Sequence, residues 1–273
     1  MPELPEVETM VNDLRPLLTG RRFGHVTLSQ DDVLHGITKR AIVTGLTGAR
    51  VVAMTRRAKN AVIATDRRRL VIQPGMTGSM FVKRRLTLDD QRYGVLRVTL
   101  DNGRIFLYHD VRRLGTIRWV DDRSWDRFSS AIGPEPLDPT FTPGLLGAIL
   151  GRSRAAVKKV LMDQRHLAGV GNIYANEALF AARIDPSKEA RKLSPEDHRR
   201  LHHHVVRILA AAVSASGTTI RDYRTGTGES GNFQLELMVY DREGEPCRVC
   251  GTTLAGTHLI DARITVFCHR CQR

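Results

Sequence analysis

Four cysteines near the carboxyl end of this 273-residue chain form two pairs with the same internal spacing. Two residues separate Cys247 from Cys250 and Cys268 from Cys271, and seventeen residues lie between the pairs. This spacing lets both sulfurs of a pair reach one metal ion. Four thiolates complete a tetrahedral zinc site and leave no position for water. We therefore predict one structural zinc ion per chain.

The amino terminus, Met1-Pro2-Glu3, carries a second set of reactive groups. An initiator Met before a small residue is normally removed, so we expect the mature chain to begin with the secondary amine of Pro2. An α-amino group has a lower pKa than lysine, and the positive end of a helix lowers that pKa further. Such an amine can attack an anomeric carbon and form an iminium, and Glu3 can carry the proton.

A structural interpretation of the same residues is equally simple. Proline is favoured in the first turn of a helix, and glutamate suits the positive helix end. From these residues alone the structural interpretation is the more economical one, so the catalytic interpretation needs independent support.

The charge of the chain favours a polyanionic partner. Forty-two Lys and Arg against 29 Asp and Glu give a formal net charge of +13, which attracts nucleic acid. A basic composition also arises in proteins from GC-rich genomes. The sequence contains no apolar run long enough to span a membrane and no basic signal peptide, so we expect a cytoplasmic protein that does not contact membranes.

The segment Leu259–Phe267, between the cysteine pairs, is predicted to form a β-hairpin arm with Arg263 near its tip. An arginine in this position suits insertion into a DNA groove or contact with phosphates. A solvated surface arginine is the alternative.

The residue pattern in the first half of the chain predicts one helix followed by many strands. From Glu3 to Leu18, apolar residues recur with helical spacing. Asp101-Asn102-Gly103 predicts a tight hairpin turn. The runs with strand character are His25–Leu28, Val51–Thr55, Ala61–Thr65, Leu70–Gln73, Met80–Lys83, Val95–Leu100, Arg104–Tyr108 and Thr116–Val120. This half is expected to be a β-sandwich or barrel.

The second half predicts helices and then the cysteine segment. A Pro-rich stretch that begins at Gly133 marks a linker. Helices are expected over about 144–150, 154–163, 173–182 and 194–215, followed by a Gly/Thr/Ser-rich loop over 216–232. The expected organisation is a catalytic domain at 1–132, a linker at 133–143, a helical DNA-binding domain at 144–240 and a zinc finger at 241–273.

Several motifs together resemble bacterial formamidopyrimidine-DNA glycosylases, in family order and from end to end of the chain. They are Pro2-Glu3-Leu4-Pro5-Glu6-Val7-Glu8-Thr9, Arg56-Arg57-Ala58-Lys59, Gly75-Met76-Thr77-Gly78-Ser79, Leu167-Ala168-Gly169-Val170-Gly171-Asn172-Ile173-Tyr174-Ala175 and the two cysteine pairs. The resemblance implies an α+β fold with an N-terminal helix, an N-terminal β-sandwich, a helix-two-turn-helix module and a C-terminal zinc-finger hairpin.

The resemblance also implies an activity and a partner. The activity is excision of 8-oxoguanine and formamidopyrimidines in base excision repair, followed by strand cleavage through β- and δ-elimination. The partner is double-stranded DNA with oxidised bases or abasic sites, bound by a monomer associated with the nucleoid. By position, the resemblance makes Pro2 the nucleophile, Glu3 the acid/base and Lys59 a supporting lysine that meets phosphate.

Further positions match residues that contact DNA in the family. Asn172 and Arg263 match a pair that holds phosphate, and Arg263 is counted with the catalytic set. Lys158 matches a lysine that reaches the lesion site. An extruded nucleotide leaves a gap in the base stack, and three positions match the residues that fill it: Met76, Arg112 and Leu114. Without the resemblance, Met76 and Leu114 would be interpreted as core residues and Lys158 as a solvated one.

Lesion recognition is assigned by the same resemblance to Glu6 and to a loop that closes over the base, which comprises Thr218, Thr219, Ile220, Arg221, Asp222 and Tyr223. Two positions depart from the family pattern. Position 114 is Leu where the family commonly has Phe, and Gln73 stands where it commonly has a His beside the DNA backbone. Neither departure removes a reactive group.

Two other functions remain open. An enzyme of the endonuclease VIII type shares the nucleophile but prefers oxidised pyrimidines; Leu4 and the long 216–232 loop favour the purine-specific branch. A catalytically silent zinc protein that binds DNA is the second alternative. The presence of Pro2, Glu3 and Lys59 argues against that alternative.

Overall fold

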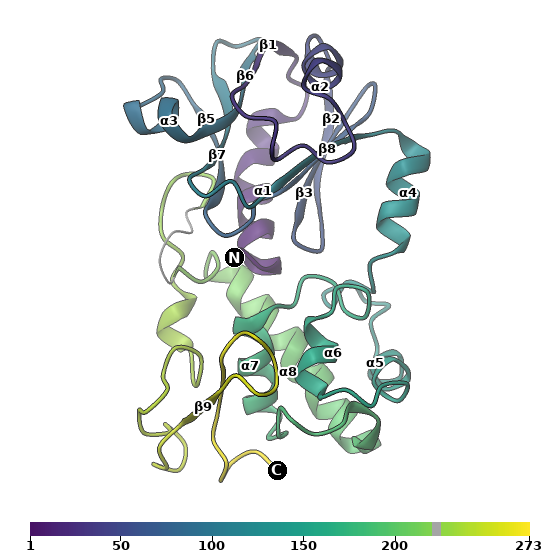
Figure 1. Ribbon diagram of the computed structural model, residues 1–273, viewed down its shortest axis with the longest axis vertical. Coiled ribbons are helices and arrows are strands. Elements are labelled where there is room, and N and C mark those ends of the chain that lie inside the picture. Colours follow the sequence, from purple (N-terminus) through teal and green to yellow (C-terminus); the bar gives the residue numbers. More distant parts are fainter. Residues whose placement is uncertain (220–224) are drawn as a thin grey trace. The chain divides into compact units, whose positions relative to one another are not determined.

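Helix α1 (Leu4–Leu18) opens the computed structural model, which describes residues 1–219 and 225–273. Its periodic apolar side chains are completely buried, as their spacing predicts: Val7, Met10, Val11, Leu14 and Leu18. Burial of a large apolar side chain contributes about 1.5–3 kcal/mol. The helix packs against strands of two different sheets, between which it lies in Figure 1.

Eight strands follow, each within two residues of its predicted position. They are β1 (Phe23–Leu28), β2 (Val51–Arg57), β3 (Asn60–Thr65), β4 (Arg69–Gln73), β5 (Gly78–Lys83), β6 (Gly94–Leu100), β7 (Ile105–Asp110) and β8 (Thr116–Val120). They form two four-stranded sheets with the orders β1-β6-β7-β5 and β2-β3-β4-β8. Every pairing in both sheets is antiparallel. Apolar side chains from both sheets and α1 share one core.

The turn between β6 and β7 has the predicted geometry. Gly103 adopts a φ of 78°, which a residue with a Cβ rarely reaches. Leu100 donates its N–H to the Arg104 carbonyl at 2.8 Å, which closes the hairpin.

Three short helices in this half were not predicted: α2 (Lys39–Leu46), α3 (Leu88–Tyr93) and α4 (Asp122–Ser130). Each begins after a side chain that accepts a hydrogen bond from the backbone of the first turn, namely Thr38, Thr87 and Asp121. Capping therefore stabilises helices whose apolar periodicity is too short to be recognised.

The second half is helical, as predicted. It contains α5 (Pro143–Leu150), α6 (Val157–Met162), α7 (Asn172–Ala181) and α8 (Pro195–Ser214), with 3-10 turns η1 (Ala190–Lys192) and η2 (Phe233–Glu236). Helix α7 packs on α6 and α8, and α5 packs on α8. Strands β9 (Ala255–Thr257) and β10 (Thr265–Phe267) then form a short antiparallel hairpin. Its strands are shorter than expected, because residues 258–264 form the connecting loop that carries Arg263.

The chain divides into two units by its internal contacts. The first unit comprises Met1–Ala131 and Ala215–Asn232, and the second comprises Ile132–Ser214 and Phe233–Arg273. The segment 215–232 thus belongs with the sandwich, whereas the sequence analysis placed it in the helical domain. The reason is that backbone N–H groups of this segment donate hydrogen bonds to acidic side chains of α1.

Among the described residues, no helix is both long enough and apolar enough to cross a bilayer.

Candidate functional site

The start of α1 holds the residues around Pro2 in a fixed arrangement. Pro2 is buried and precedes Glu3, which caps the helix. The Glu3 carboxylate accepts a hydrogen bond from the Glu6 backbone, and the Glu6 carboxylate accepts one from the Glu3 backbone at 2.8 Å. This reciprocal pair is a capping box. While Met1 is attached, the Pro2 nitrogen is an amide and not an amine.

Glu6 also binds the 215–232 segment. Its other carboxylate oxygen accepts the Thr218 backbone N–H at 2.8 Å, and the Glu6 side chain is almost completely buried. A second acid of α1, Asp13, accepts the Gly226 N–H at 2.9 Å. Burial raises the pKa of Asp13, and the hydrogen bond from Gly226 opposes that shift. The segment is therefore attached to α1 at two points.

Part of the predicted lesion-recognition loop can be described. Thr218 is buried, and the Thr219 hydroxyl accepts the Gly231 N–H at 2.8 Å, which draws the two ends of the segment together. The remaining predicted members lie outside the described residues: Ile220, Arg221, Asp222 and Tyr223.

Lys59 lies in the two-residue turn between β2 and β3 and is only 4% exposed. Its neighbour Ala58 has a φ of 52°, a strained value for a residue with a side chain. Arg56 donates to the Ala58 carbonyl at 2.9 Å and to the Glu8 carboxylate of α1 at 2.6 Å. This chain of contacts ties the Lys59 turn to the helix that begins beside Pro2.

The three predicted gap-filling residues are exposed and lie on two neighbouring loops. Met76 is 45% exposed in the loop between β4 and β5, and Leu114 is 52% exposed in the loop between β7 and β8. The Arg112 guanidinium lies 3.6 Å from the Met76 sulfur. Gln73 is half-buried at the end of β4. The structure thus brings Met76, Arg112 and Leu114 together on one surface.

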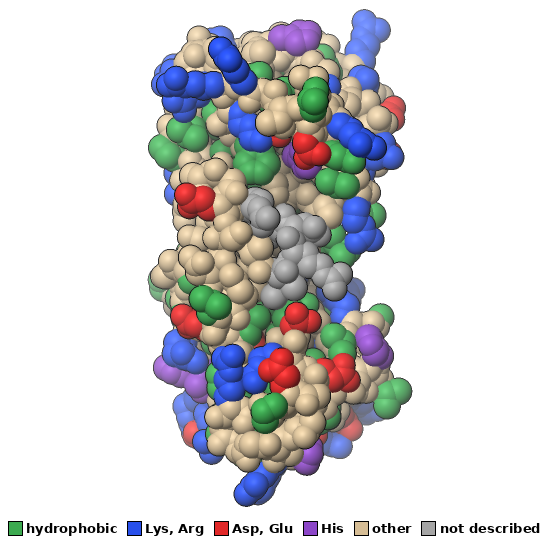
Figure 2. Space-filling view, turned by 90° about the vertical axis from the view of Figure 1, so that its left-hand side faces the viewer, with side chains coloured by type: hydrophobic (Ala, Val, Ile, Leu, Met, Phe, Trp, Pro, Cys, Tyr) green, Lys and Arg blue, Asp and Glu red, His purple; other side chains and the backbone are tan. Residues whose placement is uncertain are grey.

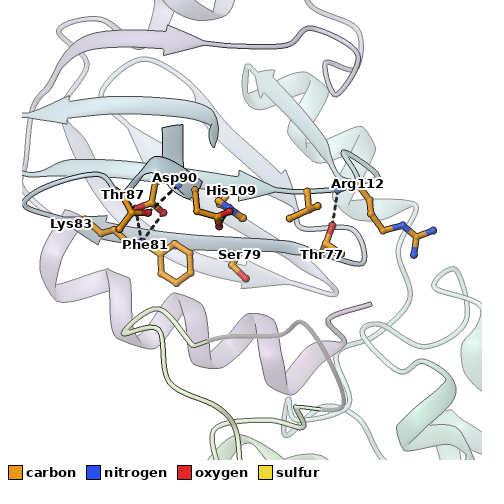
Figure 3. A pocket seen from close by; sticks show the side chains of 10 residues that line it. Thr77, Ser79, Phe81, Lys83, Thr87, Asp90, His109 and Arg112 are labelled. Carbon is orange, nitrogen blue, oxygen red and sulfur yellow. Dashed lines mark hydrogen bonds and ion pairs between the residues drawn. The ribbon is translucent and has the colours of Figure 1, made fainter. Parts of the chain in front are cut away.

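A cavity of about 470 Å³ lies beside these loops, against β5, β7 and α3 (Figure 3). Thr77 and Arg112 mark one end, and the ion pair between Lys83 and Asp90 marks the other. Lys83 holds the pKa of Asp90 below its usual value against the opposing effect of burial. The residues that line the cavity do not include Pro2 or Glu3.

In the second unit, two predicted DNA-binding residues meet at the zinc-finger hairpin. The Lys158 ammonium donates to the Ile264 carbonyl at 3.1 Å and to the Thr265 hydroxyl at 2.7 Å. The Asn172 amide donates to the same Ile264 carbonyl at 3.1 Å. Lys158 is 0% exposed. Its ammonium therefore faces the hairpin and not the solvent, which differs from the exposed position that the sequence analysis implied.

Arg263 lies one residue before this junction, and its side chain is 52% exposed. Its guanidinium Nε lies 3.3 Å from the Asp261 carboxylate, which also accepts the Arg263 backbone N–H at 3.0 Å. Asp261 therefore orients Arg263, whose side chain remains half exposed.

The four cysteines form a metal-binding cluster. Their sulfurs all lie within 4.8 Å of one another, with Cys250 and Cys268 at 3.5 Å and Cys247 and Cys271 at 4.0 Å. Two thiolates on one tetrahedral zinc ion are roughly 3.8 Å apart. The cluster therefore has the dimensions of a four-thiolate site, as its spacing in the sequence predicts.

Burial disfavours the thiolate form of Cys268 and Cys271 when no cation is bound. Hydrogen bonds from Thr252 lower the pKa of Cys250 to about 6, whereas burial and the neighbouring thiols raise the pKa of Cys271 to about 12. A bound divalent cation would offset the repulsion among the thiolates.

Comparison with known proteins gives the family. A model described as the formamidopyrimidine-DNA glycosylase N-terminal domain matches residues 1–117, and a model of the H2TH domain of the same enzymes matches residues 132–224. The formamidopyrimidine-DNA glycosylase of Xanthomonas campestris pv. campestris (strain B100) is 43% identical over 274 residues, with all of both chains covered. The chain belongs to the formamidopyrimidine-DNA glycosylase family.

Solved structures agree with this assignment. The MutM (Fpg) protein from Thermus thermophilus is 36% identical, with 99% of this chain and 98% of that chain covered and a TM-score of 0.87. A Lactococcus lactis Fpg mutant in complex with DNA that contains Fapy-dG is 30% identical, with complete coverage of both chains and a TM-score of 0.91. As a member of this family, the chain is a DNA glycosylase of base excision repair.

Three buried residues of this family member were missed in the sequence analysis. Glu177 accepts three backbone N–H groups, from Met238, Val239 and Tyr240, at 2.8–2.9 Å. Burial raises the pKa of Glu177, and these hydrogen bonds oppose the shift. The side-chain amide oxygen of Asn176 accepts the Val266 N–H at 3.1 Å. Asn176 and Glu177 are adjacent polar residues in a largely apolar helix, and this pattern could have identified both positions from the sequence.

The third missed residue, Asp110, lies at the end of β7 and is 1% exposed. Nothing in its sequence context distinguishes it from a strand-terminal surface residue.

On one face of this DNA glycosylase, the positively charged side chains are divided among several groups. Figure 2 shows one face, on which Lys and Arg side chains lie in several separate groups with acidic side chains between them. The net charge of +13 therefore does not gather in a single patch on that face.

Proposed function

We propose that this chain excises oxidised purines from duplex DNA through a Schiff base on Pro2. The substrates are 8-oxoguanine and formamidopyrimidines, and strand cleavage follows by β- and δ-elimination. The placement of Pro2 carries the proposal: this residue is buried directly before the capped start of α1. The positive helix end disfavours a charged amine there, which keeps the amine nucleophilic.

The chemistry begins after Met1 is removed. The Pro2 amine attacks the anomeric carbon, the bond from that carbon to the base breaks, and the base leaves with a proton from Glu3. The sugar ring then opens: the bond from the anomeric carbon to the ring oxygen breaks, and the oxygen takes up the proton that the amine loses. The iminium formed in this way acidifies the adjacent sugar carbon. Loss of a proton there expels the 3′ phosphate, and a second elimination expels the 5′ phosphate.

The other first-unit residues serve binding in this proposal. Lys59 contacts phosphate and supports the reaction from its turn beside α1. Glu6 and Thr218 border the extruded nucleotide, as do Thr219 and the loop residues that follow it. Gln73 meets the DNA backbone, and the exposed side chains of Met76, Arg112 and Leu114 fill the gap that the nucleotide leaves.

The second unit supplies phosphate contacts. Arg263 is the exposed cation of the hairpin loop, and it binds phosphate together with Asn172. We assign Lys158 a different role from the one that the resemblance implies. Because its ammonium is buried against Ile264 and Thr265, Lys158 holds the hairpin loop that presents Arg263.

Zinc is the proposed occupant of the cysteine cluster, held by Cys247, Cys250, Cys268 and Cys271. The ion is structural, because the four thiolates complete its coordination. A repair enzyme of this kind acts where chromosomal DNA lies, so we also propose a cytoplasmic location at the nucleoid.

The lesion preference is the first prediction. Single-turnover excision is measured on duplexes that carry 8-oxoguanine or an oxidised pyrimidine, and 8-oxoguanine should be excised faster. Glu3→Gln should lower the rate about 10²–10⁴-fold, because general acid catalysis is lost, while the amide oxygen can still cap α1. The control is Glu196→Gln, a half-exposed acid of α8. Faster excision of the pyrimidine would assign the chain to the endonuclease VIII type.

The second prediction concerns zinc. Native protein should contain one zinc ion per chain, and its removal by a chelator should abolish DNA binding until zinc is restored. Both tryptophans, Trp119 and Trp125, lie in the first unit, so tryptophan emission should not change. Zinc-free protein that binds lesion duplex with normal affinity would contradict the structural role.

The third prediction concerns Arg263. The logarithm of DNA affinity should fall linearly with the logarithm of salt concentration, and Arg263→Ala should reduce that slope by about one. Arg248→Ala removes the same charge from an exposed position of the cysteine segment and serves as the control. If both variants keep the wild-type slope and affinity, Arg263 does not bind phosphate.

A further inference from the structure

Asp110 connects the two loops that carry the exposed residues Met76, Arg112 and Leu114. One carboxylate oxygen accepts the Thr77 hydroxyl at 2.5 Å. The other accepts the Gly115 backbone N–H and the Tyr108 hydroxyl, both at 3.0 Å. Thr77 belongs to the first loop and Gly115 to the second, so one buried carboxylate is bound to both loops.

The Thr77 hydroxyl extends this connection to Arg112. It donates to Asp110 and at the same time accepts the Arg112 backbone N–H at 3.0 Å, a contact drawn in Figure 3. The backbone position of Arg112 therefore depends on the Thr77 hydroxyl, even though the two residues lie on different loops.

The backbones of the two loops are also in direct contact. A Cβ on Gly75 would lie 2.5 Å from the Gly115 nitrogen, and Gly75 has a φ of 70°. A Cβ on Gly115 would overlap the Tyr108 hydroxyl and lie 2.5 Å from the Gln73 carbonyl oxygen. Neither loop can move far without the other.

Tyr108 strengthens the arrangement as a permanent donor. Burial raises the pKa of its hydroxyl, and the negative charge of Asp110 raises it further. Tyr108 therefore stays protonated, and its one hydroxyl proton lies between two acceptors, Asp110 and the Pro74 carbonyl oxygen at 3.2 Å. Together, three donors satisfy Asp110, as a buried carboxylate requires.

We propose that Asp110 and Thr77 are positioning residues that hold the loops of Met76, Arg112 and Leu114 together as one rigid wedge. The inference rests on the proposed function, because these three side chains fill the gap left by the extruded nucleotide. Extrusion costs a few kcal/mol of stacking and pairing. Two loops that are already fixed relative to each other lose less conformational entropy upon binding than two loops that must be ordered at that moment. Their contacts with DNA therefore offset more of the cost of extrusion.

Variants of Thr77 test the wedge. Thr77→Val keeps the shape but removes both hydrogen bonds, whereas Thr77→Ser keeps the hydroxyl. We expect Thr77→Val to slow single-turnover excision of 8-oxoguanine from duplex about tenfold, as expected for loss of a hydrogen bond to a charged group, and Thr77→Ser to restore the rate. Borohydride trapping at an abasic site in a single-stranded oligonucleotide should not change, because no opposite base or stack has to be replaced.

The matched control is Thr99→Val. The Thr99 hydroxyl of β6 also accepts a backbone N–H, from His25 at 2.7 Å, but lies away from both loops. Three results would each overturn the proposal: wild-type excision by Thr77→Val, equal losses on the duplex and single-stranded substrates, or no recovery in Thr77→Ser.

Hydrogen exchange of the free protein tests the connection without any catalytic readout. Thr77→Val should speed exchange of the amides of Arg112 and Gly115 relative to wild type and to Thr99→Val. Unchanged exchange would overturn the proposal. If wild-type protein neither excises 8-oxoguanine nor traps abasic DNA, the proposed function fails, while the exchange measurement still decides whether the loops are joined.

Discussion

The buried carboxylate of Glu6 is the interaction on which the proposed chemistry depends. It accepts the backbone N–H of Glu3 at the start of α1 and that of Thr218 in a segment from the far end of the sequence. If Glu6 lost its carboxylate, two N–H groups would lose their acceptor, at a cost of about 1–3 kcal/mol each. The residue after Pro2 and the Thr218 end of the 215–232 segment are therefore held by the same side chain.

Buried polar side chains hold several irregular segments of the chain in position. Asp110 joins two loops, and Glu177 accepts three consecutive backbone N–H groups before the cysteine segment. Asn176 and Lys158 fix the hairpin that carries Arg263. Loops have fewer backbone hydrogen bonds of their own than helices and strands, so polar side chains from neighbouring elements satisfy some of their N–H groups. Buried polar side chains thus position exposed residues such as Arg263.

The sequence predicted what local periodicity and spacing determine. Apolar spacing gave α1, β-branched runs gave the eight sandwich strands, and paired cysteines gave the metal cluster. It missed α2, α3 and α4, because capping side chains stabilise them, and it did not predict that the contacts of 215–232 are made with the sandwich. The connections of Asp13 and Glu6 to that segment depend on long-range contacts. Lys158 shows the same limit, since burial of its ammonium follows from the hairpin packed on it.

In the proposed mechanism, the free amine of Pro2 forms the covalent intermediate. Borohydride is added during turnover of a duplex that contains 8-oxoguanine, and the cross-linked protein is digested and examined by mass spectrometry. The account predicts a nucleotide adduct on a peptide that begins at Pro2, and no adduct when an uncleaved residue precedes Pro2. An adduct on Lys59 or any other lysine, or full trapping by protein that retains Met1, would contradict it.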